Sequence, residues 1–130
     1  MRRLTLLLLL LISTTVLAEW TEFGGNTDFD LTSYIDFETI KRKDNKVWMW
    51  SLFDYKTVQK FKNYRYLSQV SRMEYDCEEE TKRILDFYWY SENMRSGEVV
   101  YSETSIESEE ESIIPVSLDK DIFEIVCNKK

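Results

Sequence analysis

Pairs of carboxylates are the residues whose types and spacing could do chemistry in this sequence. Asp36 and Glu38 are two positions apart, as are Glu74 and Asp76, and this spacing places side chains on one face of a strand. Two acids on one face, or the run Glu78 to Glu80, could serve glycoside-type acid–base catalysis. Charge runs in acidic proteins usually form solvated surface, so we expect that the protein is not an enzyme.

Other catalytic chemistries lack their residues. The sequence contains no histidine, which removes the Ser-His and Cys-His nucleophile systems and the usual zinc ligands. Its three glycines, Gly24, Gly25 and Gly97, form no phosphate-binding loop. The acidic run from Glu107 to Glu111 does not space its oxygens like a known calcium site. We therefore expect neither a metal nor a cofactor.

The two cysteines, Cys77 and Cys127, are a candidate disulfide. In an exported chain without histidine, a disulfide is favoured over metal ligation. Closing a loop of about 50 residues would stabilise the fold by roughly 4 kcal/mol. The alternative is two buried reduced thiols that pack as small hydrophobic groups. A thiol titration under denaturing conditions separates the two.

One basic patch stands out in this acidic chain, between Lys56 and Tyr66. Cations beside aromatic rings could bind an acidic protein segment or a sulfated glycan. The alternative is that the cations keep a loop soluble or protect an exposed strand edge. The candidate binding residues are Lys56, Lys60, Lys62 and Arg65, with Phe61, Tyr64 and Tyr66 interleaved.

Residues 1–18 are predicted to be a cleaved signal peptide. Two arginines precede an apolar run, Leu4 to Ile12, and small or modest residues precede Glu19. The run is short for a permanent membrane anchor, which needs about 20 residues. No cysteine follows the cleavage position to accept a lipid. We therefore expect a periplasmic or secreted protein without a stable membrane anchor.

The mature chain, residues 19–130, has the size of one domain. Removing two of the 17 basic residues with the signal leaves 15 against 24 acidic ones, a formal net charge of −9. A chain this acidic is a poor candidate for binding nucleic acid or an anionic membrane.

Alternating and aromatic-rich runs predict about six strands, whose short connections favour antiparallel pairing. Turn chemistry is expected at Gly24-Gly25-Asn26 and in the polar segment Lys41 to Lys46. The run Val47 to Tyr55 is apolar on both faces, so we expect a central strand covered on each side. The predicted strands are Glu19 to Phe23, Phe29 to Ile40, Val47 to Tyr55, Leu67 to Cys77, Thr81 to Tyr90 and Glu98 to Ser102.

The last part of the chain predicts a loop and then one helix. Residues 103–114 are acidic without a sustained pattern, so a mobile loop is expected there. After Pro115, Ser117 can cap a helix of about ten residues, with Asp119 in its first turn. These elements together predict an α+β fold in which Cys127 of the helix is tied to the sheet at Cys77.

The chain resembles the bacterial surface-adhesin protein E family. The resemblance rests on Tyr34-Ile35-Asp36 followed by Thr39-Ile40, on Glu74-Tyr75-Asp76-Cys77 with the aromatic strand after it, and on the Pro115 to Cys127 helix. It covers essentially the whole mature chain. It implies an antiparallel sheet of about six strands, a C-terminal helix tethered by a disulfide, and binding of host extracellular-matrix proteins at the cell surface. The namesake adhesin is lipid-anchored, whereas Glu19 follows the predicted cleavage position here.

The function expected from these observations is that of an exported, non-enzymatic binding module with a protein or glycan ligand. The alternative is a periplasmic structural or assembly protein. Such a protein would use an unpaired sheet edge to form a homodimer or to pair with a client strand.

Overall fold

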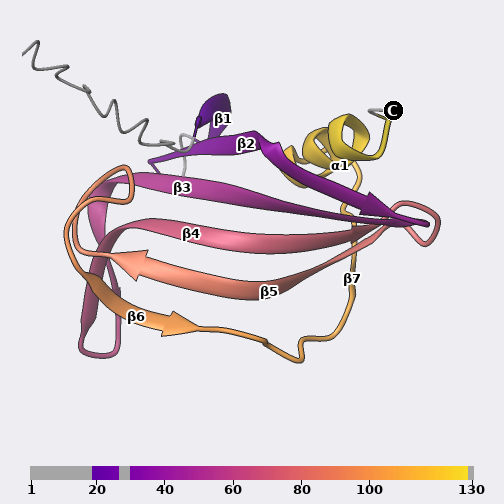
Figure 1. The fold of residues 1–130 in the computed structure, drawn as a ribbon. Coiled ribbons are helices and arrows are strands. Elements are labelled where there is room, and N and C mark those ends of the chain that lie inside the picture. Colours follow the sequence, from indigo (N-terminus) through magenta and orange to yellow (C-terminus); the bar gives the residue numbers. More distant parts are fainter. Residues whose placement is uncertain (1–18, 27–29, 129–130) are drawn as a thin grey trace, which may run out of the picture.

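The structure, a computed structural model, describes residues 19–26 and 30–128 of the chain. One antiparallel sheet dominates it, with β1 to β6 side by side in the order of the sequence (Figure 1). The strands are β1 (Thr21–Asn26), β2 (Leu31–Lys43), β3 (Lys46–Phe61), β4 (Tyr64–Asp76), β5 (Thr81–Tyr90), β6 (Val99–Glu103) and β7 (Glu111–Ser112). The short β7 lies off this path and pairs with β5. The predicted signal peptide lies outside the described residues.

The architecture is mainly β, which corrects the predicted α+β class. A single helix, α1 (Leu118–Asn128), accompanies seven strands within the described part of the chain. The prediction of about six antiparallel strands and one C-terminal helix is confirmed. The class was wrong because eleven residues of helix cover only part of one face of a much larger sheet.

Helix α1 packs its apolar face onto one end of the long strands. Its Ile122, Phe123 and Val126 are buried, and the alternation of β3 places Val47 and Met49 on the same side of the sheet. Figure 1 shows α1 near one end of these strands and the bent β3–β4 hairpin at the other. The core cluster consists of Ile35, Val47, Met49, Tyr75, Ile113, Ile122, Phe123 and Val126.

The N-terminal strand corrects the predicted turn at Gly24-Gly25-Asn26. These residues continue β1 instead, and the register slips between Glu22 and Gly24. A Cβ added at Gly25 would lie 2.9 Å from the Leu31 carbonyl oxygen, so glycine allows the backbone to approach closely here.

The connection between β2 and β3 is shorter than the sequence predicted. Strands β2 and β3 extend to Lys43 and from Lys46, which leaves a turn at Asp44 and Asn45. The register between β2 and β3 slips between Asp36 and Lys41.

The acidic segment 103–114 is held along β5, not mobile as predicted. Ile106 N donates to the Leu85 carbonyl at 2.8 Å, and Ser108 Oγ donates to the Ile84 carbonyl at 2.8 Å. Ile113 is buried at 8% exposure. Three points of attachment therefore order a stretch that has no periodic pattern of its own.

Candidate functional site

The β3–β4 hairpin carries all four predicted binding residues. Strands β3 and β4 pair along most of their length, but the register slips between Asp54 and Gln59. Past this irregularity the hairpin bends away from the sheet, toward β6 (Figure 1). The turn falls at Lys62 and Asn63, where Lys62 has a left-handed φ of 53°.

Alternation separates the cations of this hairpin from its aromatic rings. Lys60 pairs directly with Arg65, whereas Gln59 pairs with Tyr66 and Phe61 with Tyr64. Because successive side chains of a strand point to opposite faces, Lys60 and Arg65 share the outer face. The predicted cations and aromatic residues are thus neighbours in sequence but occupy two different surfaces.

The four cations are exposed and lack ionic partners. Lys56, Lys60, Lys62 and Arg65 are all exposed, and none forms an ion pair with any residue of 19–26 or 30–128. Lys62 Nζ lies 5.5 Å from the centre of the Phe61 ring. Two like charges directly opposite on one face repel each other, so this arrangement costs stability unless an anion binds.

The inner face of the hairpin packs on Trp89 of β5. The Tyr66 ring stacks on Trp89 with centres 4.3 Å apart and an angle of 8° between planes. Tyr64 lies 6.3 Å from Trp89 and 4.8 Å from Tyr101 of β6. Trp89 Nε1 donates to Gln69 Oε1 at 2.8 Å, which satisfies the polar atom of a ring that is only 8% exposed. We call Phe61, Tyr64, Tyr66, Phe87, Trp89 and Tyr101 the aromatic cluster.

Burial in this region changes the acidity of two tyrosines. Desolvation raises the pKa of Tyr55 to about 12, with a smaller contribution from Tyr66. Desolvation also raises the pKa of Tyr66. Both phenols are therefore neutral at physiological pH and add no negative charge near the cations.

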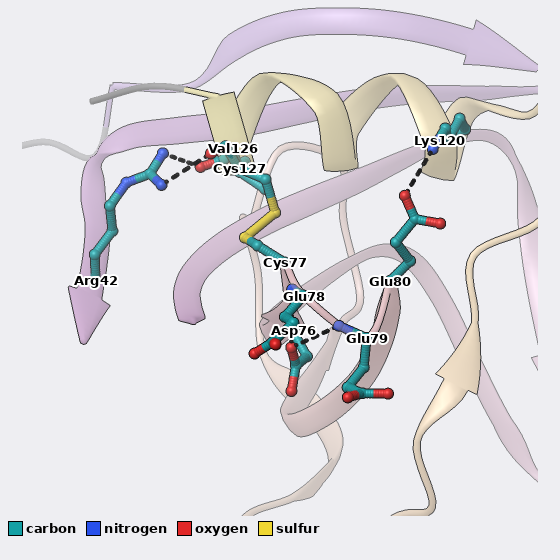
Figure 2. Close-up of a disulfide and its surroundings, with 9 residues drawn as sticks. All are labelled: Arg42, Asp76, Cys77, Glu78, Glu79, Glu80, Lys120, Val126 and Cys127. Atoms are coloured by element: carbon teal, nitrogen blue, oxygen red, sulfur yellow. Dashed lines mark hydrogen bonds and ion pairs between the residues drawn. A yellow bond between two sulfur atoms is a disulfide. The ribbon is translucent and has the colours of Figure 1, made fainter. Parts of the chain in front are cut away.

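The opposite end of the sheet holds the predicted disulfide. Cys77 follows β4 and Cys127 lies in the last turn of α1, with Cα atoms 5.6 Å apart (Figure 2). Arg42 of β2 donates to the carbonyls of Val126 and Cys127, where the helix leaves backbone acceptors unsatisfied. Figure 2 also shows Lys120 of the helix beside Glu80, at 3.7 Å.

The paired carboxylates of the sequence are engaged in structural interactions. Asp36 Oδ1 accepts from the Glu38 backbone N at 3.1 Å. Glu74 is paired with Arg83 and accepts from Trp48 Nε1 at 3.1 Å. The backbone N of Glu79 donates to Asp76 at 3.0 Å, which with Lys46 holds the pKa of Asp76 below its usual value. Asp36, Glu74 and Asp76 thus each accept a hydrogen bond from a different group.

The sequence led us to expect no metal, and the structure shows how the acidic groups are arranged. No group of three or more potential ligands gathers in the part of the chain that the structure describes. Glu110, within the acidic segment, pairs instead with Lys46 at 3.0 Å.

Sequence reasoning missed a second surface, on the sheet face opposite α1. Trp48 and Trp50 were expected to be covered, but in the described structure no helix lies on their side. They are half-buried and line hollows together with Tyr88. The sequence did contain a signal for this surface, because aromatic residues are spaced two apart in β3 and again in β5, at Tyr88 and Tyr90. Only the strand register shows that they share one face.

These features define a class: a mainly β protein with one long-stranded antiparallel sheet and a single helix bound to it by a disulfide. A family model described as surface-adhesin protein E matches residues 20–128. The chain therefore belongs to the surface-adhesin protein E family.

Solved structures of Haemophilus influenzae protein E have the same fold. One has 15% sequence identity and a TM-score of 0.59, covering 88% of this chain and 87% of that one. A selenomethionine form has 14% identity and a TM-score of 0.58, covering 88% and 89%. A second crystal form has 14% identity and a TM-score of 0.56, covering 73% and 79%. No curated protein sequence matches.

Proposed function

We propose that this chain is an exported, non-enzymatic adhesin-like module that binds an acidic extracellular ligand through the outer face of the β3–β4 hairpin. Membership of the surface-adhesin protein E family supports the binding role. The signal-like residues 1–18 support export to the periplasm or beyond, with residues 19–130 as the mature domain. None of the helices in the described ranges is long and apolar enough to cross a membrane.

One observation carries the choice of surface. Exposed cations without described ionic partners gather on the hairpin of a chain whose formal net charge is −7. The aromatic cluster anchors the hairpin from its inner face, so the cations are presented on a packed element. Anionic groups of a protein segment or a sulfated glycan would satisfy this charge, and attraction between exposed charges weakens with salt.

The test compares two pairs of charge removals at opposite ends of the sheet. Lys60→Ser with Arg65→Ser, extended by Lys62→Ser, should weaken binding to heparin or to poly-glutamate at least tenfold at low salt. Lys41→Ser with Lys43→Ser removes two exposed cations elsewhere and should leave that binding nearly unchanged. The two probes separate a sulfated glycan from an acidic polypeptide. Equal binding by all variants would remove the hairpin from the proposal.

A second candidate function uses the edge of the sheet. Strand β6 pairs with β5 on one side only among the described strands, and Val99 at its start is 48% exposed. An edge strand can pair with a second copy or with a client strand, as a periplasmic assembly protein would require. Light scattering during size exclusion tests this, since a monomer at all concentrations would exclude pairing between copies.

A further inference from the structure

The sheet face opposite α1 carries two adjoining hollows, which we together call the groove. They have volumes of about 460 and 660 Å³ and share Thr39, Trp50 and Tyr88 in their linings. Trp20 and Tyr90 line one hollow and Trp48 lines the other. Each hollow has the volume of a typical ligand site. This groove is separate from the cations of the hairpin.

Strand register arranges the groove as parallel rows. Trp48 pairs with Glu74 and Glu74 with Arg83, and the next row contains Trp50, Arg72 and Asp86. A third row contains Leu52, Val70 and Tyr88. Rows repeat at about 7 Å along a strand, because side chains on one face are two residues apart. The first two rows thus combine an indole ring with charged side chains, and the third adds the Tyr88 ring beside the buried Leu52 and Val70.

The aromatic rings of the groove are fixed but not fully covered. Trp50 and Tyr88 have ring centres 6.3 Å apart at 37°, and both are half-buried. The bond from Trp48 Nε1 to Glu74 holds the indole in place. Large rings with one side toward solvent provide flat apolar contact area at low conformational cost.

The charges of the groove neutralise one another. Arg72 pairs with Asp86, and Arg83 pairs with Glu74. Asp86 and Glu74 are only 7% and 6% exposed, so separating either pair would leave a buried charge uncompensated. Besides Arg72 and Asp86, the charged lining residues are Asp36, Glu38, Lys41 and Arg95, two of each sign. The groove therefore offers no net charge that would select an ion.

We propose that this groove binds a neutral glycan chain of several sugar units. The apolar faces of sugar rings fit the half-exposed indole and phenol rings. A hydroxyl both donates and accepts, so sugar hydroxyls match a lining that contains carboxylates together with guanidinium and ammonium groups. A proline-rich peptide also fits aromatic grooves, but its carbonyls only accept and would leave Asp36 without a donor from the ligand.

The experiment uses the mature chain, residues 19–130, in native gels that contain dextran, galactomannan, hydroxyethylcellulose or soluble starch. At least one of these polymers should retard the chain, with little change between about 0.05 and 1 M salt, unlike electrostatic binding. Trp50→Ala and Tyr88→Ala should each lower the affinity about tenfold. Phe61→Ala, a ring 52% exposed on the hairpin, is the matched control and should bind normally.

A second, milder variant serves as a control for loss of folding. Trp50→Phe keeps an aromatic face and should retain most of the affinity, and thermal unfolding of every variant reports its folded state. The inference is overturned if a folded chain is retarded by none of the four polymers, or if retardation persists in Trp50→Ala and Tyr88→Ala. Binding that disappears in 1 M salt would also overturn it, as would binding to a proline-rich peptide alone. The double variant Lys60→Ser with Arg65→Ser can lose binding at the hairpin without affecting binding in the groove, because those cations lie outside the groove.

Discussion

The two ends of the long strands are stabilised in different ways. At one end, a helix covers the sheet, a disulfide joins it to β4, and Arg42 binds its last carbonyls. At the other end, the β3–β4 hairpin has neither helix nor covalent link and is held by rings packed around Trp89. The first end is fixed by a covalent bond and a buried core, and the second by strand pairing and the packing of aromatic rings.

This difference shows how a small protein can present a charged projection. The aromatic cluster uses every second residue of the hairpin, which leaves the alternate positions free to carry cations. At the helix end, several lysines pair with carboxylates instead: Lys82 with Asp119, and Lys46 with Asp76 and Glu110. The four hairpin cations form no ion pair with any residue that the structure describes.

The largest expected loss of stability follows from removing the disulfide at the helix end. Replacing both Cys77 and Cys127 with alanine should lower the free energy of unfolding by about 4 kcal/mol, because the bond closes a 50-residue separation. Denaturant unfolding measures the loss. Hydrogen exchange should show faster opening of α1, while exchange of the amides of the β3–β4 hairpin under native conditions stays the same.

A control completes this test. Reductant should destabilise the wild-type chain to a similar extent and leave the double alanine variant unaffected. Unchanged unfolding of the wild-type chain after full reduction, verified by thiol titration, would contradict the assignment.

The next largest loss of stability is expected from removing an aromatic ring at the hairpin end. Tyr66→Leu keeps an apolar side chain but removes the ring stacked on Trp89, so stability should fall by about 1 kcal/mol from the ring pair. Tyr34→Leu makes the same change on β2, where no ring contact is described, and should cost less. Equal losses at the two sites would mean that stacking does not stabilise the hairpin.

A smaller loss of stability is expected from removing the cap at the start of α1. Lys120 N donates to Ser117 Oγ at 3.2 Å, so Ser117→Ala should lower stability by about 1 kcal/mol or less. Loss of the cap should let the start of the helix unwind. Because the disulfide holds the other end of the helix, this unwinding should be confined to the first turn. Amide exchange of residues 118–121 measures it, and Ser117→Asp, which can also cap, should restore protection.

A further effect depends on pH. Burial raises the pKa of Tyr55 to about 12, whereas an unfolded tyrosine ionises near about 10. The stabilisation is therefore fully present below pH 10 and is lost as the pH rises through about 12. Between these values the melting temperature of the wild-type chain should fall more steeply than that of Tyr55→Phe. Parallel curves for the two proteins would show that this phenol does not contribute.

Local signals in the sequence predicted much of the fold. Ser117 caps the helix, the alternation around Tyr75 marks a half-buried strand, and the two cysteines pair as expected. These features depend on residues close in sequence or on a choice between few partners. The four cations were also singled out from a local pattern, and their role in binding stays a prediction.

Features that depend on tertiary placement could not be predicted. Segment 103–114 has no pattern, and backbone bonds to β5 order it. The groove depends on the register of three strands, which brings Trp50, Arg72 and Asp86 into one row. Nothing in the spacing of these residues along the chain gives that register.

The link between Cys77 and Cys127 has a further consequence for cleavage by proteases. The covalent ring that it closes contains β5, β6, β7 and the exposed connection at residues 92–98. A protease that cuts one peptide bond in this connection opens the chain but releases no fragment, since both pieces stay joined through sulfur. The nicked molecule would separate into two bands on a gel only after reduction, and until then it would keep its hairpin and its helix together.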